Sequence, residues 1–228
     1  MLVTILAHTP EPERVVAMAA RLCYSPEGIA ALRTGEPEAD RQLIAKIMAL
    51  GHVSVLEHAS FTIGIEGVSR ALSHQLVRHR IASFSQQSQR YVAFDRGFSY
   101  QVPPSIAAEE ELAREYRQLM AAAAACYGRL RAAGVPAEDA RFVLPNGADT
   151  RLVMTMNARE LRHFFRLRCC RRAQWEIRRL ATEILRQVKK IAPLLFEQAG
   201  PGCLAGACPE GEMSCGEAAA VRREFADL

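Results

Sequence analysis

The 228-residue sequence has no apolar run long enough to span a membrane. Its longest such stretch, around residues 120–125, lies between Arg117 and Arg129, whereas a spanning helix needs about 20 apolar residues. The first residues also lack the basic region and the small-residue cleavage site of a secretory signal. We therefore expect a cytoplasmic protein that does not associate with membranes.

The common glycine-rich and hydrolase motifs are missing as well. The sequence contains no Walker loop, no zincin motif and no Gly-x-Ser-x-Gly elbow. The nearest dinucleotide-type pattern begins at Gly200, but it follows a helix-like segment instead of a strand and contains Pro201. If the protein binds a nucleotide, it must do so with side chains.

Cysteines are present in an odd number, seven, and without an export signal. This combination argues against a disulfide framework and indicates reduced thiols. Cys203, Cys208 and Cys215 lie in a Gly/Pro-rich segment, but their spacings are not the paired two-residue gaps of zinc ribbons or fingers, and no histidine lies nearby. A packed or exposed loop is favoured there, and we predict no metal site in the chain.

Lysine is scarce, because 26 of the 29 basic residues are arginine. Eleven arginines fall between residues 141 and 186, so the basic character is concentrated in the last third of the chain. Such a concentration is typical of a nucleic-acid surface or of a phosphate-binding cleft. The hydrophobic content of 50% places the chain with ordinary globular proteins.

The spacing of apolar residues predicts both strands and helices. We expect strands at 1–7, 61–65 and 152–156, an extended stretch at 89–94, and helices at 11–24, 40–50, 68–80, 106–133 and 174–198, with a further helix beginning at 157. Helices outweigh strands, and no internal repeat occurs. We therefore predict a single α+β domain over residues 1–216, with a central, mostly antiparallel or mixed sheet and long helices, followed by a tail at 217–228.

The densest polar motif covers residues 78–91, where arginines, a histidine, glutamines and serines are concentrated. A guanidinium presents a planar fork of donors that matches phosphate oxygens, and Ser and Gln can hydrogen-bond the polar edge of a heterocycle. Gln75, Arg78 and His79 are spaced to share one helical face. The motif therefore suits an anionic, polar ligand, with a solvated basic helix end as the alternative.

A second cluster of the same kind follows downstream, with Arg141, Asn157, Arg159, His163 and Arg168. Asn157 forms a capping-box-like pattern with the glutamate three residues later. Arg168 lies about three helical turns after Asn157 and projects from a similar side. Taken singly, these residues could be a helix cap and solvated charges. Two such clusters together favour one composite site.

These blocks resemble the flavin-dependent thymidylate synthases. The signature is Arg78-His79-Arg80, seven residues and then Ser88, and further matching blocks occur in the family's order at 51–58, 75, 90–91, 140–145, 157–160, 167–168 and 173–177. One departure is the stretch Ser85-Gln86-Gln87-Ser88, where many members have Asn-Glu-x-Ser. Gln86 therefore cannot supply a carboxylate.

The resemblance implies reductive methylation of dUMP to dTMP without an enzyme nucleophile, with methylenetetrahydrofolate as one-carbon donor, FAD as cofactor and NADPH as reductant. It also implies a homotetramer with active sites at subunit interfaces. Flavin would contact Ser54, Arg78, His79, Arg80, Gln86, Asn157, Arg159 and His163. The dUMP substrate would contact Gln75, Arg78, Gln86, Gln87, Ser88, Gln89, Arg90, Arg141 and Arg168.

Within this set, Arg168 is the expected catalytic residue. A fixed cation beside the uracil ring favours negative charge on its nitrogen 3 and carbonyl oxygens. Ser88 is assigned to binding, and Cys169 and Cys170 to packing, because no activating base is evident beside them.

Two other functions stay open at this point. The arginine density and the pI of about 8.8 are also compatible with a nucleic-acid-binding protein, although aromatic platforms for single strands are lacking and we expect no nucleic-acid partner. An NADPH-dependent flavoprotein reductase without methyl transfer would share the flavin-binding residues.

Overall fold

The computed structural model describes residues 1–32, 36–226 and 228. The chain divides into two compact units. Unit 1 comprises residues 1–2, 64–78 and 84–153, and unit 2 comprises residues 3–63, 79–83 and 154–228. A single domain over residues 1–216 stays a prediction.

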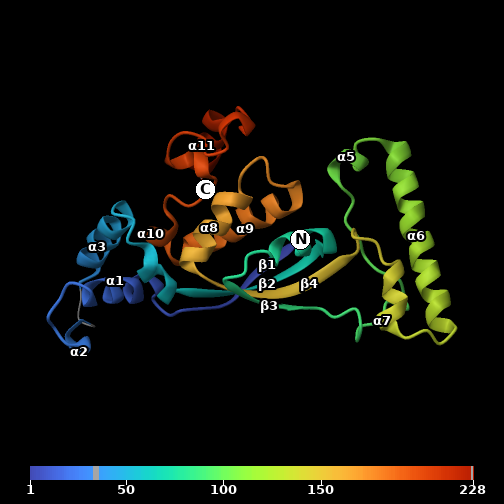
Figure 1. Ribbon diagram of the computed structural model, residues 1–228, viewed down its shortest axis with the longest axis horizontal. Coiled ribbons are helices and arrows are strands. Elements are labelled where there is room, and N and C mark those ends of the chain that lie inside the picture. The colour runs from blue at the N-terminus through green and yellow to red at the C-terminus, as the bar shows by residue number, and fades with distance from the viewer. Residues whose placement is uncertain (33–35, 227) are drawn as a thin grey trace. The chain divides into compact units, whose positions relative to one another are not determined.

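The sheet has four antiparallel strands in the order β1-β2-β4-β3 (Figure 1). The strands are β1 (Leu2–His8), β2 (Ser60–Ser69), β3 (Ala82–Gln86) and β4 (Asp149–Asn157). The predicted α+β class is confirmed. Strand β3 was missed because its sequence, Ala-Ser-Phe-Ser-Gln, has one large apolar side chain and so gives little alternation signal.

Strands β1 and β2 differ in how much they bury. In β2, Phe61, Ile63 and Ile65 are fully buried at every second position. On the opposite face of the sheet, the Thr62 hydroxyl hydrogen-bonds that of Thr155 at 3.0 Å. The apolar and β-branched residues at 1–7 favour a buried strand, and that interpretation was wrong. In β1, which lies at the edge of the sheet, only Val3 is buried.

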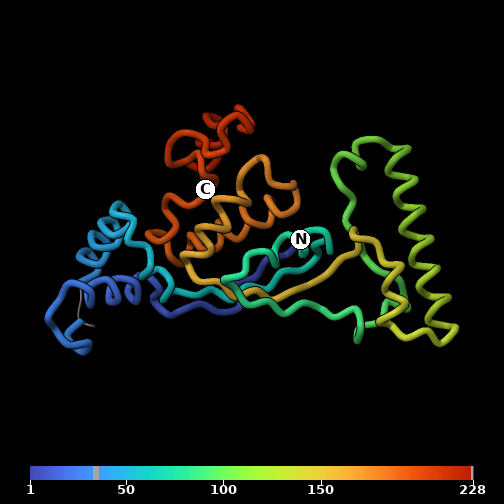
Figure 2. The backbone as a smooth tube through the Cα atoms, viewed as in Figure 1, coloured from blue at the N-terminus to red at the C-terminus, as the bar shows by residue number. Residues whose placement is uncertain are grey.

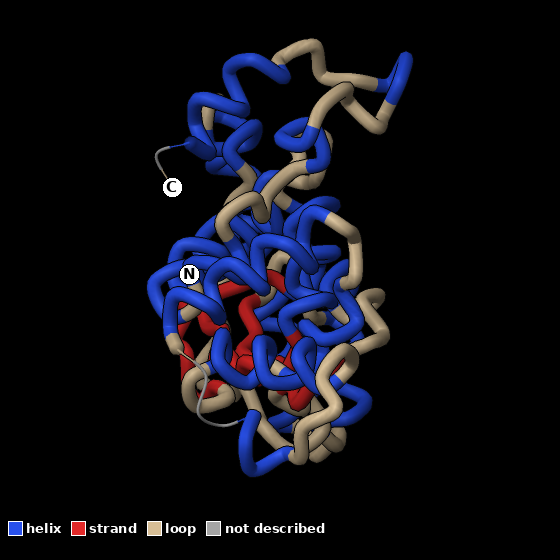
Figure 3. The backbone as a smooth tube through the Cα atoms, turned by 90° about the vertical axis from the view of Figure 1, so that its left-hand side faces the viewer, coloured by secondary structure: helices blue, strands red, loops and turns tan. Residues whose placement is uncertain are grey.

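Unit 2 contains most of the helices. Figure 3 shows all helices of the chain in blue. They are α1 (Pro12–Leu22), α2 (Ile29–Leu32), α3 (Pro37–Ala49), α8 (Ala158–Arg168), α9 (Trp175–Ile191), α10 (Pro193–Phe196) and α11 (Ala218–Ala226), with 3-10 turns η1 (Val53–His58), η3 (Gly202–Ala205) and η4 (Gly211–Met213). The predicted helix over 174–198 is two helices, because Pro193 has no N–H to continue α9.

The core of unit 2 forms where α8, α9 and α10 bury their apolar faces. Helix α9 buries a stripe with helical spacing, consisting of Ile177, Leu180, Ala181, Ile184, Leu185 and Val188. Aromatic rings join the elements, since the Phe196 ring lies 5.6 Å from that of Phe61 and 5.9 Å from that of Phe165. Helix α8 is thereby packed against α9 and α10, and it carries several of the predicted site residues.

Unit 1 is built around α6 (Glu110–Ala132), with α4 (Arg70–Leu76), α5 (Pro104–Ala107), α7 (Ala137–Ala140) and the 3-10 turn η2 (Arg141–Val143). The fully buried Tyr127 of α6 accepts a hydrogen bond from the Phe94 N–H at 3.3 Å and packs edge-on against the Phe94 ring. The stretch 89–94, expected to be extended, is mainly turns. The Val92 N–H donates to the Ser88 carbonyl and closes the first of them.

The last part of the chain, red in Figure 2, follows α10 through η3 and η4 to α11. The predicted tail at 217–228 is largely the helix α11, which buries Val221 and Phe225. Among the described residues, no helix is long and apolar enough to cross a membrane.

Candidate functional site

The predicted site residues fall into two groups, one in each unit. Unit 1 holds Gln75, Arg78, Gln86, Gln87, Ser88, Gln89, Arg90 and Arg141, and unit 2 holds Ser54, His79, Arg80, Asn157, Arg159, His163 and Arg168. This division nearly coincides with the two expected ligands. The exceptions are Arg78 and Gln86, which were expected at both ligands and lie in unit 1, and Arg168, which was expected at dUMP and lies in unit 2.

The prediction that Gln75, Arg78 and His79 share one helical face was wrong. Helix α4 ends at Leu76, and the Arg78 N–H donates to the Gln75 carbonyl in a tighter turn. Short helices owe their stability mainly to a buried apolar face. Between Leu76 and Ile81 the one buried side chain is that of His79, which is polar, so no apolar residue continues that face.

In unit 2, His79 lies at the centre of a buried polar network. Its Nδ1 is 3.2 Å from Glu160 Oε1, and Arg168 Nε donates to His79 Nε2 at 3.1 Å. Arginine has donors only, so Nε2 must carry the lone pair and Nδ1 the proton, which it donates to Glu160. The network thus fixes a neutral His79 in one tautomer, with Arg168 oriented by it.

The surroundings favour that neutral form. Burial lowers the pKa of His79 below its ordinary value, the Arg168 charge lowers it further, and the Glu160 hydrogen bond opposes both. The Phe164 ring lies edge-on to the imidazole at 5.0 Å, and the His163 ring lies at 6.0 Å. Burial also lowers the pKa of the Arg168 guanidinium, which nevertheless stays protonated near neutral pH.

Ligand atoms of His79, Glu160 and His163 lie within 4.8 Å of one another, an arrangement that can hold a metal ion. Here both ring nitrogens of His79 already have partners, one of them the guanidinium of Arg168. A fixed cation at the imidazole opposes a second cation beside it. The cluster is therefore best described as a hydrogen-bond network.

Sequence reasoning missed the role of Glu160, which it assigned only to the helix cap. The cap itself is confirmed, because Asn157 Oδ1 accepts from the Glu160 N–H at 2.9 Å. The Glu160 side chain instead turns to His79. The position of Glu160 in the sequence could have revealed this contact. The residue lies next to Leu161 and one turn before Phe164, on the apolar face of α8 that packs into the core, where a carboxylate needs a polar partner.

Ser54 and Arg159 line a cavity of about 340 Å³ in unit 2. The Arg159 guanidinium also pairs with Glu57 at the protein surface. Such an exposed ion pair is weak, so an anionic ligand can replace the carboxylate at little cost. Arg80 is exposed and places a second guanidinium in the same unit.

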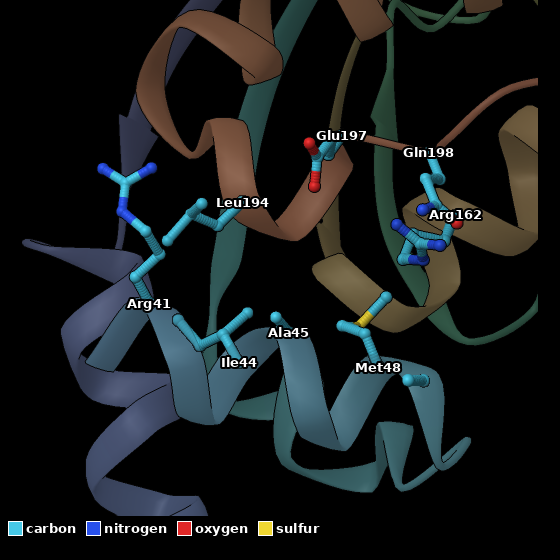
Figure 4. Close-up of a pocket in the computed structure, with 9 residues that line it drawn as sticks. Arg41, Ile44, Ala45, Met48, Arg162, Leu194, Glu197 and Gln198 are labelled. Carbon is cyan, nitrogen blue, oxygen red and sulfur yellow. The ribbon is translucent and has the colours of Figure 1, made fainter. Parts of the chain in front are cut away.

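A larger cavity of about 430 Å³ in unit 2 contains none of the predicted residues. Figure 4 shows Arg41, Ile44 and Met48 of α3 on one side of it, and Leu194, Glu197, Gln198 and Arg162 on the others. Arg162 donates to the Leu195 carbonyl at 2.7 Å and so holds α10 against α8. The size of this cavity alone does not make it the candidate site.

In unit 1, Gln86 is fixed by hydrogen bonds at the end of β3. Its Nε2 donates to the hydroxyls of Ser73 and Thr150, both at 3.0 Å. Both amide protons are thereby used, which leaves Oε1 as an acceptor. The glutamine that replaces the family's glutamate can therefore accept a hydrogen bond from a ligand but brings no negative charge.

The predicted phosphate contacts gather around Glu138 of α7. Arg90 Nε donates to Glu138 Oε2 at 2.9 Å, and Arg141 Nε donates to the Glu138 carbonyl at 3.0 Å. The Ser88 hydroxyl accepts from the Arg90 N–H at 3.1 Å, which forms a short turn. Arg90 and Arg141 thus both contact Glu138, and the Ser88 hydroxyl lies at the backbone of Arg90. Guanidinium and hydroxyl groups are the donor types that bind a monophosphate.

Comparison with known proteins identifies the family of this chain. The family described as thymidylate synthase complementing protein matches residues 4–194. The chain belongs to this family. It is 60% identical to the flavin-dependent thymidylate synthase of Geobacter sulfurreducens over 100% of this chain and 99% of the relative. It is 47% identical to that of Clostridium tetani, over 98% and 96% respectively, and 42% identical to that of Pyrococcus furiosus, over 92% and 90%.

Proposed function

We propose that this protein is a flavin-dependent thymidylate synthase that methylates dUMP reductively to dTMP. The observation that carries the proposal is 60% identity over the whole chain to a relative of that name. The finer parts of the proposal are methylenetetrahydrofolate as one-carbon donor, FAD as the flavin and NADPH as reductant. They rest on the motif resemblance and on the donor types in the two units.

The residues of unit 2 fit a flavin dinucleotide. The guanidinium groups of Arg80 and Arg159 suit its pyrophosphate. The ring of His163, exposed beside His79, suits a planar heterocycle. When bound, FAD would supply the redox chemistry that converts a transferred methylene into a methyl group. The chain itself contributes binding, orientation and charge.

The chemical role of Arg168 follows from how it is held. Its Nε is engaged by His79, and within the described part of the chain we find no other hydrogen bond of its guanidinium. The terminal nitrogens can therefore face a pyrimidine. A fixed cation there stabilises the negative charge that develops on nitrogen 3 and the carbonyl oxygens, which makes the ring carbons more reactive.

No cysteine nucleophile is needed in this scheme. Cys169, the residue after Arg168, is buried, and burial raises its pKa to about 12. A thiol with that pKa is almost fully protonated at neutral pH and is inert. This agrees with a packing role for Cys169.

The dUMP phosphate would be bound in unit 1 by Arg90, Arg141 and Ser88. A ligand phosphate would replace the exposed carboxylate of Glu138 as the partner of Arg90, because it carries more charge and more acceptor oxygens. We also propose that the protein is a homotetramer with active sites at subunit interfaces. Light scattering after size-exclusion chromatography should give a mass of about four times 25.2 kDa.

Labelled dUMP provides the decisive experiment. With FAD, NADPH and methylenetetrahydrofolate, the purified protein should form dTMP, and dUMP should accelerate NADPH oxidation. NADPH consumption without dTMP would instead indicate a flavoprotein reductase. Binding that falls steeply with salt and grows with polymer length, in a protein that retains no flavin, would indicate a nucleic-acid-binding protein.

A further inference from the structure

The cavity of about 430 Å³ in unit 2 has an apolar wall formed by two helices (Figure 4). Ile44, Ala45 and Met48 of α3 line it, together with Leu194 of α10. Methionine is flexible and adapts to the shape of a ligand. Because a cavity of about 150 Å³ already holds benzene, this one has room for a bicyclic apolar body.

Arg162 brings to this cavity a positive charge that is not paired with a carboxylate. Its guanidinium is half-buried, and Nη1 donates to the Leu195 carbonyl at 2.7 Å. In the part of the chain that the structure describes, we find no ion pair and no further hydrogen bond of this side chain. Burial lowers the pKa of the guanidinium below its ordinary value. Charges taken out of water are normally paired, so an anion in the cavity would supply the missing partner.

The charges that line the cavity suit a monoanion. Arg41 and Arg162 contribute two positive charges and Glu197 one negative charge, so the lining has a net charge of +1. Glu197 is exposed to water, and Figure 4 shows its carboxylate apart from the Arg162 guanidinium. The Gln198 amide also lines the cavity, and an amide nitrogen can donate to an anionic oxygen.

This cavity is separate from the hydrogen-bond network of His79. Arg162 and Glu160 are two positions apart on α8, which corresponds to about 200° around the helix axis, so they project from nearly opposite faces. Glu160 turns to His79, whereas Arg162 turns to α10. A ligand at Arg162 would therefore lie on the other side of α8 from the network that orients Arg168.

We propose that this cavity binds a small carboxylic acid with a compact apolar body. The carboxylate pairs with Arg162, since a carboxylate matches the planar fork of a guanidinium. The apolar body packs against Ile44, Met48 and Leu194. The site is independent of the proposed function, because none of its residues is expected at flavin or dUMP.

Isothermal titration calorimetry with naphthoate tests the proposal on the full-length protein. FAD and dUMP are kept in excess, so that their own sites are filled. We expect one naphthoate to bind per chain at neutral pH. Naphthylmethanol, which has the same rings and no charge, should bind at least about 10-fold more weakly, because a hydrogen bond between charged groups is stronger than a neutral one. The measurement does not depend on turnover, so its outcome is distinct from that of the dTMP assay.

Two variants and a control locate the binding. Arg162→Gln removes the charge and should raise the Kd of naphthoate at least about 10-fold. Ala45→Phe extends a ring into the cavity from an exposed position of α3 and should abolish binding. Arg166→Gln removes the same charge one turn later on α8, at an exposed position outside this cavity, and should leave the Kd unchanged.

Arg162→Gln also shortens the side chain that holds α10, so Ala45→Phe decides the test if that variant does not fold. Absence of naphthoate binding to the wild type would overturn the proposal. So would an unchanged Kd in Ala45→Phe or in folded Arg162→Gln, equally tight binding of naphthylmethanol, or an equal loss of affinity in Arg166→Gln.

Discussion

Replacing Glu160 with alanine tests the network that orients Arg168. The His79 side chain is 4% exposed, and its Nδ1 proton has Glu160 as acceptor at 3.2 Å. After Glu160→Ala this buried donor has no partner. An unsatisfied buried donor costs about 1–3 kcal/mol of unfolding free energy, which corresponds to a fall in Tm of about 2–4 °C per kcal/mol for a chain of this size.

The same change should affect turnover. Without Glu160 as acceptor, His79 can exchange tautomers, and a proton on Nε2 would face the Nε–H of Arg168. Arg168 then loses its fixed orientation. Displacement of a catalytic group by about 1 Å costs about 100-fold in rate, so we expect kcat to fall by about 10- to 100-fold while flavin content is kept.

Glu160→Gln is the matched control, because its amide oxygen can still accept the His79 proton. We expect this variant to lose about 1 kcal/mol and to keep most of its activity. The measurements are urea unfolding, flavin absorbance per chain and dTMP formation at saturating dUMP. If Glu160→Ala matches the wild type in both stability and kcat, or if Glu160→Gln is equally damaged, the reasoning is wrong.

Three further predictions also concern unit 2. Arg168→Ala should lose most of its kcat yet retain flavin, and unchanged turnover in the dTMP assay would exclude the activating role. Gln174→Ala removes the cap that accepts from the Glu176 and Ile177 N–H groups, so urea unfolding should show a loss of about 1 kcal/mol. Burial lowers the pKa of His79 in the folded protein, so as pH falls toward about 6.5 this histidine is protonated in the unfolded chain before it is protonated in the folded one. The free energy of unfolding should therefore decrease between pH 7.5 and 5.5, and it should decrease less in His79→Asn. An equal decrease in the two proteins would show that His79 is not the cause.

The sequence was sufficient for much of the local structure. The apolar spacing of residues 174–198 predicts the helix that contains α9, since a stripe at helical spacing can be buried only if the chain is helical. The spacing of Asn157 and Glu160 predicts the start of α8, because the cap depends on neighbours within one turn. Where helices end was harder to predict, as α4 shows, because that depends on what the next residues pack against.

The sequence by itself also determined the family, since the order and chemistry of the motif blocks are independent of folding details. Only the tertiary structure decided which side chains meet. It joins Glu160 to His79 and His79 to Arg168, and it brings Arg162 to the cavity of Met48. The physical reason is that hydrogen bonds and ion pairs act over a few ångströms in space, whereas these partners lie far apart in the sequence. Their proximity is set by how the core packs.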